Sequence, residues 1–373
     1  MQRDAKNILI AASSGRALAA SARRAGYISY IIDLFEDFDT VAMSAATKNA
    51  CAKNTLRFDK IKLQQAIDSF AAIDFHAIVF GAGFEQDTAL LDVLNTQNNL
   101  FGNSPELIES LKQPATFFGL LDHLDIPFAR VRVNVPLDAD GWLAKTIAAT
   151  GGAHVQAAQA VAASDDIYFQ RFEEGRNLSM LFLANGKKAQ LVGFNEQLTQ
   201  AVGDARYCYS GAINHAELPD EMKNQIARKL AALVETTGLV GLNSVDFILR
   251  DDKYFVLEIN PRLSATVELY DQDFPRGLLH AHMRACEGEL PESMPAEKNI
   301  RGHKIVWAQQ NTKLPATFKF PAWCADIPQP GSFIAKDAPL CSVLVNGPSH
   351  AAVLAQLEKR SAEIQSQLLE QAA

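Results

Sequence analysis

The sequence is poor in cysteine and has no long apolar run. Its 373 residues include five cysteines, and none of these forms a CxxC pair or stands at metal-ligand spacing from a histidine. This distribution favours free thiols in a reducing compartment over a disulfide framework or a zinc site. The apolar runs are far shorter than the ~20 residues that a membrane helix needs, and no signal-peptide pattern precedes the first of them. We therefore expect a cytoplasmic protein that makes no use of a membrane.

An excess of basic residues is also missing. The formal net charge is −8 at pH 7 and the isoelectric point is near 5.5. A large nucleic-acid surface needs a basic face, so we expect no nucleic-acid partner. The hydrophobic content of 48% and the charged content of 21% are ordinary for a globular protein. The length allows two or three domains with sizeable cores.

The first strand-to-helix turn contains only one glycine. An apolar run at 7–12 is followed by the turn SSGR at 13–16, a helical pattern, and a second apolar run at 28–33. This order predicts a parallel sheet, and we expect residues 1–105 to form a small doubly wound domain. A dinucleotide fingerprint needs G-x-G-x-x-G. A nicotinamide enzyme is therefore the weakest alternative, and we expect a Rossmann-like fold without its usual cofactor.

Turn and cap residues divide the rest of the chain. Ser104 and Pro105 predict the start of one helix, a second begins near Pro114, and a long amphipathic helix extends from Pro219 to Gly238. Residues 128–185 alternate between short strands and helices, with an Asn-Gly hairpin turn at 185–186. A strand at 299–310 and a last helix at 349–371 are also expected.

The segment NSVDFILRDDKYFVLEINPR (243–262) predicts a hairpin that brings oxygen ligands together. With a three-residue turn at 251–253, Arg250 would face Tyr254, Asp246 would face Glu258 and Ser244 would face Asn260. Alternation would then place one apolar set in the core. That set is Val245, Phe247, Leu249, Phe255, Leu257 and Ile259.

Two carboxylates and an amide on one face of a hairpin suit a hard cation. Asp246, Glu258 and Asn260 offer the oxygens that Mg²⁺ prefers. Arg262 follows at the next position on the same face, and a guanidinium beside a metal fits a site that also holds phosphate. The alternative is the polar face of a surface hairpin.

Phosphate would need further donors, and two upstream lysines are candidates. Lys145 precedes a flexible turn with Thr150, Gly151 and Gly152, where backbone N–H groups could approach phosphate oxygens. Lys112 lies just before the helix that begins near Pro114. Each lysine alone is typical of a solvated surface, but together with the hairpin they provide the charge that ATP would require.

These residues resemble the ATP-grasp superfamily, in particular its carboxylate–amine ligases and biotin-carboxylase-like members. The most specific part is the pattern D/E-x(11)-E-x-N-x-R, and the segment QRFEEGRNLSM (170–180) precedes it. The start of the chain also resembles carboxyaminoimidazole ribonucleotide synthetases. The resemblance implies an α/β fold with three parts: a Rossmann-like domain at 1–105, a two-part ATP-grasp domain at 106–295 with a lid at about 128–185, and a small C-terminal lobe at 296–373.

The resemblance also implies a role for each matching residue. Lys112 and Lys145 would bind ATP phosphates, with Thr150, Gly151 and Gly152 in a mobile lid. Gln170, Arg171 and Phe172 would form a hinge whose backbone reads adenine. Asp246, Glu258 and Asn260 would ligate Mg²⁺ or Mn²⁺. Arg262 and Lys145 would be the catalytic residues, and Arg262 would steady the acyl phosphate and the transferring phosphoryl group. Ser264 and Thr266 would line the acceptor site.

At three places the sequence departs from the family pattern, and each departure bears on a role or activity that the resemblance implies. The lid has two glycines where many relatives have more, which leaves its closure open. Asn177 stands where a hinge acid often contacts ribose. The Gln-Val-Glu-His segment that follows the arginine in biotin-dependent carboxylases is replaced by LSATVE at 263–268.

The expected function is therefore an ADP-forming ligase that activates a carboxylate as an acyl phosphate and joins it to an amine. The segment ADIPQPGSFIAKDAPLCSVLVNG (325–347) resembles ATP-grasp proteins of which some are linked to one-carbon cofactor pathways, and tyramine–glutamate ligases are relatives of that kind. This resemblance makes glutamate and an aromatic amine or amino acid the first substrates to consider. The alternatives are a carboxylase that activates bicarbonate and a nucleotide-binding module without catalysis. Relatives are often dimers, which makes a homodimer possible.

Overall fold

A parallel sheet with helices on both faces forms the N-terminal part of the molecule. The structure is a computed structural model that describes residues 5–53, 55–95, 97, 99–162, 164–295 and 299–372. The sheet has the order β3-β2-β1-β4-β5. Its strands are β1 (Asn7–Ala11), β2 (Ile28–Asp33), β3 (Ala46–Asn49), β4 (Ala77–Phe80) and β5 (Leu100–Phe101), and its helices are α1 (Arg16–Ala25), α2 (Phe38–Met43), α3 (Lys60–Asp68) and α4 (Ala89–Leu94).

Alternation along β1 explains the two faces of this sheet. Ile8 and Ile10 pack with α1 on one side, while Leu9 and Ala11 pack with α3 and α4 on the other. Every strand pair is parallel, as the strand–helix–strand order predicts. The short elements α2, β3, α4 and β5 were not expected, because their segments of two to six residues carry too little periodicity to be recognised.

The structure explains why the first turn has a glycine at position 15. A Cβ on Gly15 would lie 2.3 Å from the side chain of Ile31, so a larger residue cannot fit there. The backbone N–H of Gly15 donates to the Asp33 carboxylate at 3.1 Å, and the N–H groups of Phe35 and Glu36 donate to the same side chain. Asp33 therefore orders the loops at the carboxyl ends of β1 and β2.

A small sheet follows two helices. Helices α5 (Pro105–Lys112) and α6 (Pro114–His123) begin where the sequence predicts, and the Ser104 hydroxyl caps α5 by accepting from the N–H of Leu107. The sheet has the order β6-β9-β7-β8, with β6 (Val131–Arg132), β7 (Trp142–Thr146), β8 (Gln156–Ala157) and β9 (Ile167–Arg171), and the short helix η1 spans Ala158–Ala160. Within the segment VRVNVP (131–136), whose alternation is typical of a strand, only the first two residues pair.

The central element is an eight-stranded antiparallel sheet. Its order is β14-β13-β10-β11-β12-β15-β19-β17. The members are β10 (Arg176–Asn185), β11 (Ala189–Val202), β12 (Ala205–Asn214), β13 (Val240–Arg250), β14 (Lys253–Asn260), β15 (Ile300–Trp307), β17 (Cys324–Ala325) and β19 (Pro339–Gly347). The hairpin between β10 and β11 turns at 186–188, so only Gly186 of the predicted Asn-Gly turn lies in it, and Asn185 is the last residue of β10.

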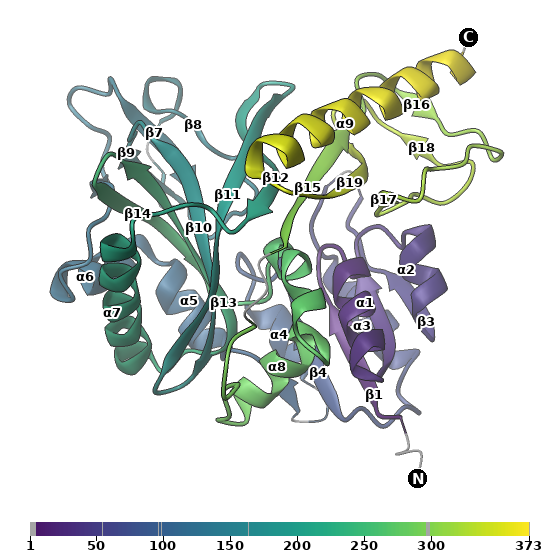
Figure 1. Cartoon of the computed structure of the whole chain (residues 1–373), viewed down its shortest axis with the longest axis horizontal. Coiled ribbons are helices and arrows are strands. Elements are labelled where there is room, and N and C mark those ends of the chain that lie inside the picture. Colours follow the sequence, from purple (N-terminus) through teal and green to yellow (C-terminus); the bar gives the residue numbers. More distant parts are fainter. Residues whose placement is uncertain are drawn as a thin grey trace.

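Helices cover both faces of this sheet (Figure 1). Leu178, Met180 and Phe182 of β10 share a core with α6 and α7 (Asp220–Thr237), while Leu181 and Leu183 share one with α1 and α8 (Gly277–Cys286). The sheet is thus buried on both sides near its centre. Together, the parallel and antiparallel sheets confirm the predicted α/β class.

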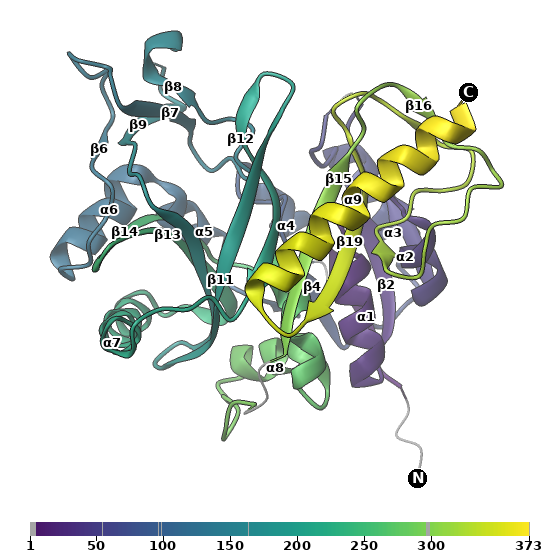
Figure 2. The ribbon, with the colours of Figure 1, turned by 45° about the horizontal axis from the view of Figure 1, so that its top comes forward.

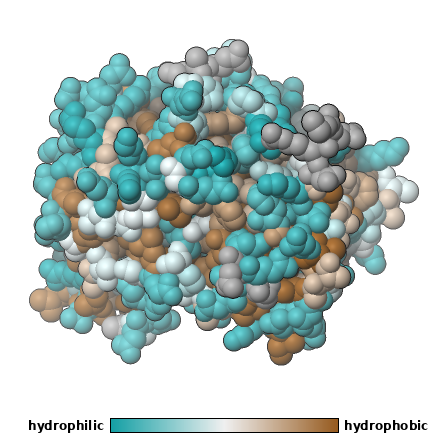
Figure 3. Space-filling view, turned by 90° about the horizontal axis from the view of Figure 1, so that it is seen from below, coloured by the Kyte–Doolittle hydropathy of each residue, from teal (hydrophilic) through white to brown (hydrophobic). Residues whose placement is uncertain are grey.

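The C-terminal part of the chain continues the large sheet rather than forming a separate one. Strand β15 pairs with β12 and β19, and the last helix, α9 (His350–Ala372), lies across β15 and β19 (Figure 2). A two-stranded pair, β16 (Thr312–Lys313) and β18 (Phe333–Ile334), completes it. Apolar and polar residues are interspersed on the face seen in Figure 3. Within the described segments, no helix has the length and apolarity needed to cross a bilayer.

Candidate functional site

The predicted hairpin forms, with a different turn and a compensating bulge. The turn has two residues, Asp251 and Asp252, so Arg250 pairs with Lys253 instead of Tyr254. Asp251 has a left-handed φ of 53°, a conformation that Asp tolerates better than most residues. A bulge between Asp246 and Phe247 then restores the predicted register at the far end.

The bulge changes which side chains are buried. Phe255 and Leu257 were expected in the core, but Tyr254 and Val256 lie there, 4% and 2% exposed. Beyond the bulge, Asp246 faces Glu258 and Ser244 faces Asn260, as predicted. The oxygen-bearing end of the hairpin therefore has the expected arrangement, while the turn end is shifted by one residue.

Asp246, Glu258 and Asn260 lie together on the predicted face. The Asn260 amide donates to Asp246 Oδ2 at 3.2 Å, and the Gln197 amide of β11 donates to Asp246 Oδ1 at 3.0 Å. Among the described residues, no group of three or more His, Cys, Asp or Glu side chains is placed to hold a metal ion. A cation here would thus be bound by two carboxylates and one amide, with other oxygens from water or substrate.

The two carboxyl groups shift each other's pKa in opposite directions. Burial and the charge of Glu258 raise the pKa of Asp246. Burial alone would raise the pKa of Glu258 as well, but the ammonium groups of Lys112 and Lys145 outweigh it and lower that pKa. A divalent cation bound between the two carboxyl groups would favour the ionised form of both. The donor set thus fits Mg²⁺ or Mn²⁺.

The structure brings both predicted lysines to this pair. Lys112 Nζ, at the end of α5, lies 3.0 Å from Asn260 Oδ1 and 3.5 Å from Glu258 Oε2. Lys145 Nζ, on β7, donates to Gln170 Oε1 at 2.6 Å, and burial lowers its pKa. The Gln170 amide donates in turn to the carbonyl of Leu257 at 3.2 Å. Gln170 therefore links the small sheet to the metal hairpin.

Arg262 lies at the junction with the N-terminal sheet. Its Nε donates to Glu85 Oε1 at 2.7 Å, and its Nη2 donates to Asn260 Oδ1 at 3.2 Å. Glu85 follows β4 and also accepts from the N–H groups of Gly83 and Phe84. Both partners are buried, so Glu85 fixes the guanidinium beside Asn260. The pKa of Glu85 is low because Arg262 and Lys112 outweigh the effect of burial.

The lid loop, residues 146–155, packs against the edge of β12. Gly151 and Gly152 have φ values of 76° and 77°, which favour glycine. The Gly151 carbonyl accepts from the N–H of Tyr209 at 2.9 Å, and a Cβ on Gly152 would lie 1.9 Å from the Tyr207 carbonyl oxygen. Thr150 precedes these glycines, so the predicted phosphate-binding turn lies directly against the large sheet.

The predicted hinge residues are only partly free to contact a base. The N–H of Arg171 donates to the Arg130 carbonyl at 2.7 Å, and the N–H of Phe172 donates to the Gly141 carbonyl at 2.9 Å. The predicted backbone contacts from these two residues therefore depend on their carbonyl groups. Asn177 lies further along, on β10, with its side-chain oxygen buried and without a hydrogen-bond donor among the described residues.

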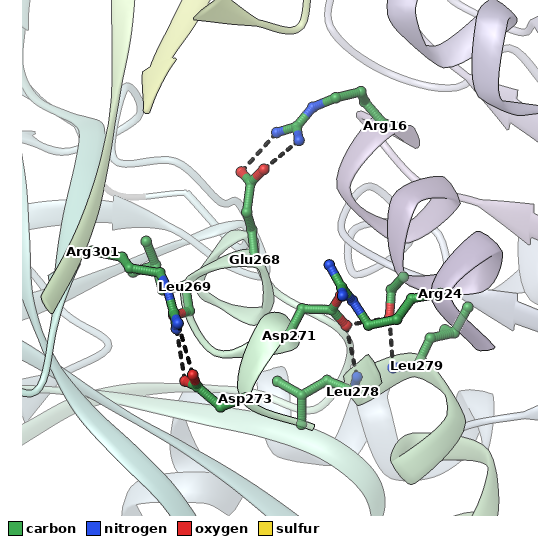
Figure 4. A network of polar contacts seen from close by, with 10 residues as sticks. Arg16, Arg24, Glu268, Leu269, Asp271, Asp273, Leu278, Leu279 and Arg301 are labelled. Carbon is green, nitrogen blue, oxygen red and sulfur yellow. Dashed lines mark hydrogen bonds and ion pairs between the residues drawn. The ribbon is translucent and has the colours of Figure 1, made fainter. Parts of the chain in front are cut away.

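A third segment, the arginine-held loop (residues 263–273), continues from Arg262. The Ser264 and Thr266 hydroxyls lie 2.9 Å apart at its start, beside η2 (Ala265–Leu269). Figure 4 shows arginines from α1 and β15 bound to three acids of the loop. The pairs are Arg16 with Glu268, Arg24 with Asp271 and Arg301 with Asp273, and the last two acids belong to η3 (Asp271–Asp273).

Three residues of this region were missed by sequence reasoning. Glu85 is 177 positions from its partner Arg262, and Gln197 is 49 from Asp246, so no local pattern connects either pair. His154 belongs to the lid loop. Burial, followed by the charges of Lys145 and Lys112, lowers its pKa to about 4, while the charge of Glu258 acts in the opposite direction. Its Nδ1 is buried without a partner in the described part of the chain. The only signal for His154 was its place after the two glycines.

Comparison with known proteins agrees with this arrangement. Residues 119–266 match a family described as "ATP-grasp domain". A 134-residue stretch is 29% identical to the carbamoyl phosphate synthase large chain of Mesorhizobium japonicum, which is 33% of this chain and 11% of that protein. The chain thus matches about a tenth of the length of this relative.

Two solved structures share the fold over almost the whole chain. Biotin carboxylase from Campylobacter jejuni, in a complex with a nucleotide, has a TM-score of 0.73 at 14% identity and covers 94% of this chain and 89% of its own. L-amino acid ligase from Bacillus licheniformis has a TM-score of 0.71 at 13% identity, with 97% and 98% covered. At these identities, the likeness establishes the architecture alone.

Proposed function

Because the chain carries an ATP-grasp domain, we propose that it is an ADP-forming ligase that activates a carboxylate as an acyl phosphate and joins it to an amine. The supporting observation is a single group of side chains, drawn from four separate segments, with complementary charges. Its members are Lys112, Lys145, Asp246, Glu258, Asn260 and Arg262. Phosphoryl transfer depends mainly on positioning and charge neutralisation, which such a group supplies.

In this proposal the hairpin holds the cation and the lysines hold the nucleotide phosphates. A bound Mg²⁺ or Mn²⁺ would neutralise phosphate charge during transfer. Asp246, Glu258 and Asn260 would bind it. Lys112 and Lys145, now satisfied by Asn260, Glu258 and Gln170, would turn toward the phosphates of ATP. The lid loop with Thr150, Gly151 and Gly152 would cover them.

Arg262 would act on the substrate end of the same site. Glu85 fixes its Nε, so Nη2 stays directed toward Asn260 while Nη1 donates to the Leu263 carbonyl at 3.3 Å. From this position Nη2 can hold the substrate carboxylate oxygen that attacks the γ-phosphate and then stabilise the acyl phosphate. The amine would attack that acyl carbon from the side of Ser264 and Thr266. We assign 1–105, 106–295 and 296–373 as the three functional parts, with the acceptor site where they meet.

The substrates are the least constrained part of the proposal. Glutamate as the acid and an aromatic amine or amino acid as the acceptor are the first pair to test. ADP and AMP release from Mg-ATP should be measured with purified protein over a panel of acids and amines that includes this pair. ADP release that requires both an acid and an amine supports the ligase. AMP release, or no release over the panel, contradicts it, and ADP release with bicarbonate alone would indicate a carboxylase.

A substitution at the metal pair separates catalysis from folding. Glu258→Gln removes a charge at the cation site, and we expect acid- and amine-dependent ADP release to fall by about 1,000-fold or more. Thermal unfolding should change little, because Gln keeps the size of Glu258 and an oxygen that can accept from Lys112. Glu196→Gln, on an exposed ion pair with Arg176, is the matched control. Near-normal activity of Glu258→Gln would disprove the metal assignment.

A further inference from the structure

A tyrosine and a histidine on neighbouring strands lie within hydrogen-bond distance of each other, and neither was among the predicted site residues. The Tyr209 hydroxyl of β12 lies 2.7 Å from His303 Nε2 of β15. Tyr209 also packs against the core cluster to which Leu263, Val267 and Leu269 of the arginine-held loop belong. Its own N–H donates to Gly151 of the lid loop. The pair therefore lies between the two loops that flank the carboxylate pair.

Tyr209 lies on β12, which pairs with β11, the strand whose Gln197 amide donates to Asp246 Oδ1. Burial raises the pKa of Tyr209 above the usual range, Asp246 and Glu268 raise it further, and Arg262 lowers it. Asp246 belongs to the proposed cation site and Arg262 to the proposed acyl-phosphate site. Glu268 belongs to the loop expected to line the acceptor. Tyr209 therefore lies next to the strand that contacts the proposed cation site and packs against the cluster that includes the loop proposed to line the acceptor.

His303 is suited to receive a proton through this hydroxyl. The residue is 4% exposed, and its Nδ1 is buried without a hydrogen-bond partner in the described part of the chain. Burial lowers its pKa, which favours the neutral ring that can accept a proton. Glu268 and Asp326 favour the protonated ring and Arg16 opposes it.

The carboxylates of the site are already committed. Asp246 and Glu258 would hold the cation, Glu85 is bound to Arg262, and Glu268 is paired with Arg16 through both oxygens. An amine that attacks an acyl carbon must lose a proton, and a positioned base typically contributes about 10²–10⁴-fold. The hydroxyl–imidazole pair is a neutral acceptor that none of these assignments uses.

We propose that Tyr209 is a catalytic residue that takes a proton from the attacking amine and passes its own hydroxyl proton to His303 Nε2. The amine nitrogen forms the new bond to the acyl carbon, and the carbon–oxygen bond to phosphate breaks with its electron pair on phosphate. The nitrogen's proton moves to Tyr209 as the tyrosine proton moves to the imidazole. His303 is the positioning residue of this relay. The inference rests on the proposed ligase activity.

The tautomer of His303 tests the relay without any substrate. Passing a proton from Tyr209 requires an unprotonated Nε2 and a hydrogen on Nδ1. Imidazole ¹⁵N spectra of the full-length protein at neutral pH should show this tautomer, with the His303 signals identified by their loss in His303→Gln. A hydrogen on Nε2 would mean that the ring donates to Tyr209, and it would overturn the relay whatever the outcome of the activity assays.

Activity with two nucleophiles tests the relay during catalysis. Hydroxylamine is unprotonated at neutral pH and traps acyl phosphates without help from a base. Tyr209→Phe should lower amine-dependent ADP release about 100-fold, because the amine loses its general base. Hydroxylamine-dependent release does not need that base and should change less than about threefold. Tyr207→Phe, which removes the same group from the same strand, is the control and should leave both rates unchanged.

The outcomes separate the relay from the ligase. Equal loss with both nucleophiles, or no loss with the amine, would overturn the relay and leave the ligase standing. Absence of ADP release from the unaltered protein with every acid and either nucleophile would overturn the ligase and the relay with it. His303→Gln keeps a hydrogen-bond acceptor for Tyr209 but no proton acceptor. Its amine rate should fall as in Tyr209→Phe, and full rescue by Gln would contradict the proton transfer.

Discussion

The arginine-held loop and the lid loop flank the same carboxylate pair but are attached in different ways. Three arginine–carboxylate pairs hold the arginine-held loop, two from α1 and one from β15. The lid loop is held against β12 by one backbone hydrogen bond and by the close approach of Gly152 to Tyr207. A loop fixed by buried charge pairs is preformed, whereas a loop held by few contacts can open at low cost.

This difference assigns separate tasks to the two ends of the site. The proposed nucleotide end must open to admit and release ATP, and closing excludes water from the phosphates. The proposed acceptor end must keep two substrates aligned, for which a rigid support is suited. The arginines that fix the acceptor end come from segments far from the loop in sequence. The N-terminal and C-terminal parts of the chain thus act as its frame.

The largest effect is expected from breaking the most buried pair of that frame. Arg301 and Asp273 have side chains 9% and 6% exposed and make two hydrogen bonds of 2.7 Å. Arg301→Met leaves the Asp273 charge buried and unpaired, which typically costs about 3–5 kcal/mol. We expect the free energy of unfolding, measured with denaturant, to fall by that amount.

An exposed arginine provides the control for this experiment. Arg284 contacts Glu287 and Glu289, and all three side chains are well exposed. Arg284→Met should leave the unfolding midpoint unchanged within error, because exposed ion pairs contribute little. If both variants unfold alike, the arginine-held loop is not stabilised by its buried pair, and the contrast with the lid loop is wrong.

A second test compares a buried histidine of helix α8, His282, with a histidine of the lid loop, His154. His282 of α8 accepts from the N–H of Leu242 through Nδ1 at 2.8 Å, and burial lowers its pKa to about 4. Because this value lies below the unfolded value near 6.5, stability is full above pH 6.5 and is lost as the pH falls toward 4. Between pH 7 and pH 5 this group should remove about 2 kcal/mol of stability.

The variants distinguish a fixed histidine from one on a loop that opens. His282→Gln should remove this part of the pH dependence when unfolding free energies are measured at several pH values. His154, with a pKa also lowered to about 4, lies in the lid loop. Opening of the lid would let His154 titrate without unfolding, so His154→Gln should leave the slope unchanged. A matching loss of slope in both variants would show that the lid is as firmly held as α8.

The hairpin shows how far sequence alone determines such a site. The pairing of Asp246 with Glu258 was predictable, because the polar side chains recur at every second position there. The turn end was not, since the run of four apolar residues at 254–257 satisfies either register. The left-handed backbone of Asp251 selects a two-residue turn, and the bulge then compensates for it.

Contacts between distant segments were beyond sequence reasoning for a different reason. The Arg262 position follows from the motif, but its partner Glu85 follows β4, in the other sheet. The pair Tyr209 and His303 likewise depends on β15 joining the large sheet next to β12. Local patterns specify strands and caps, whereas the order of strands in the sheet decides which side chains meet.

The smallest expected effect concerns the two glycines of the lid loop, which form a matched pair. Both have left-handed φ values, so a substitution by alanine at either costs about 1–2 kcal/mol locally. Only Gly152 also lacks room, since its Cβ would meet the Tyr207 carbonyl, whereas nothing lies within 4 Å of a Cβ on Gly151.

Gly152→Ala should therefore weaken Mg-ADP binding, measured by calorimetry, about tenfold more than Gly151→Ala does, a difference of about 1.4 kcal/mol. Because the lid can open locally, global unfolding should hardly change in either variant. Equal affinities would mean that nucleotide binding does not require the lid loop to lie against β12.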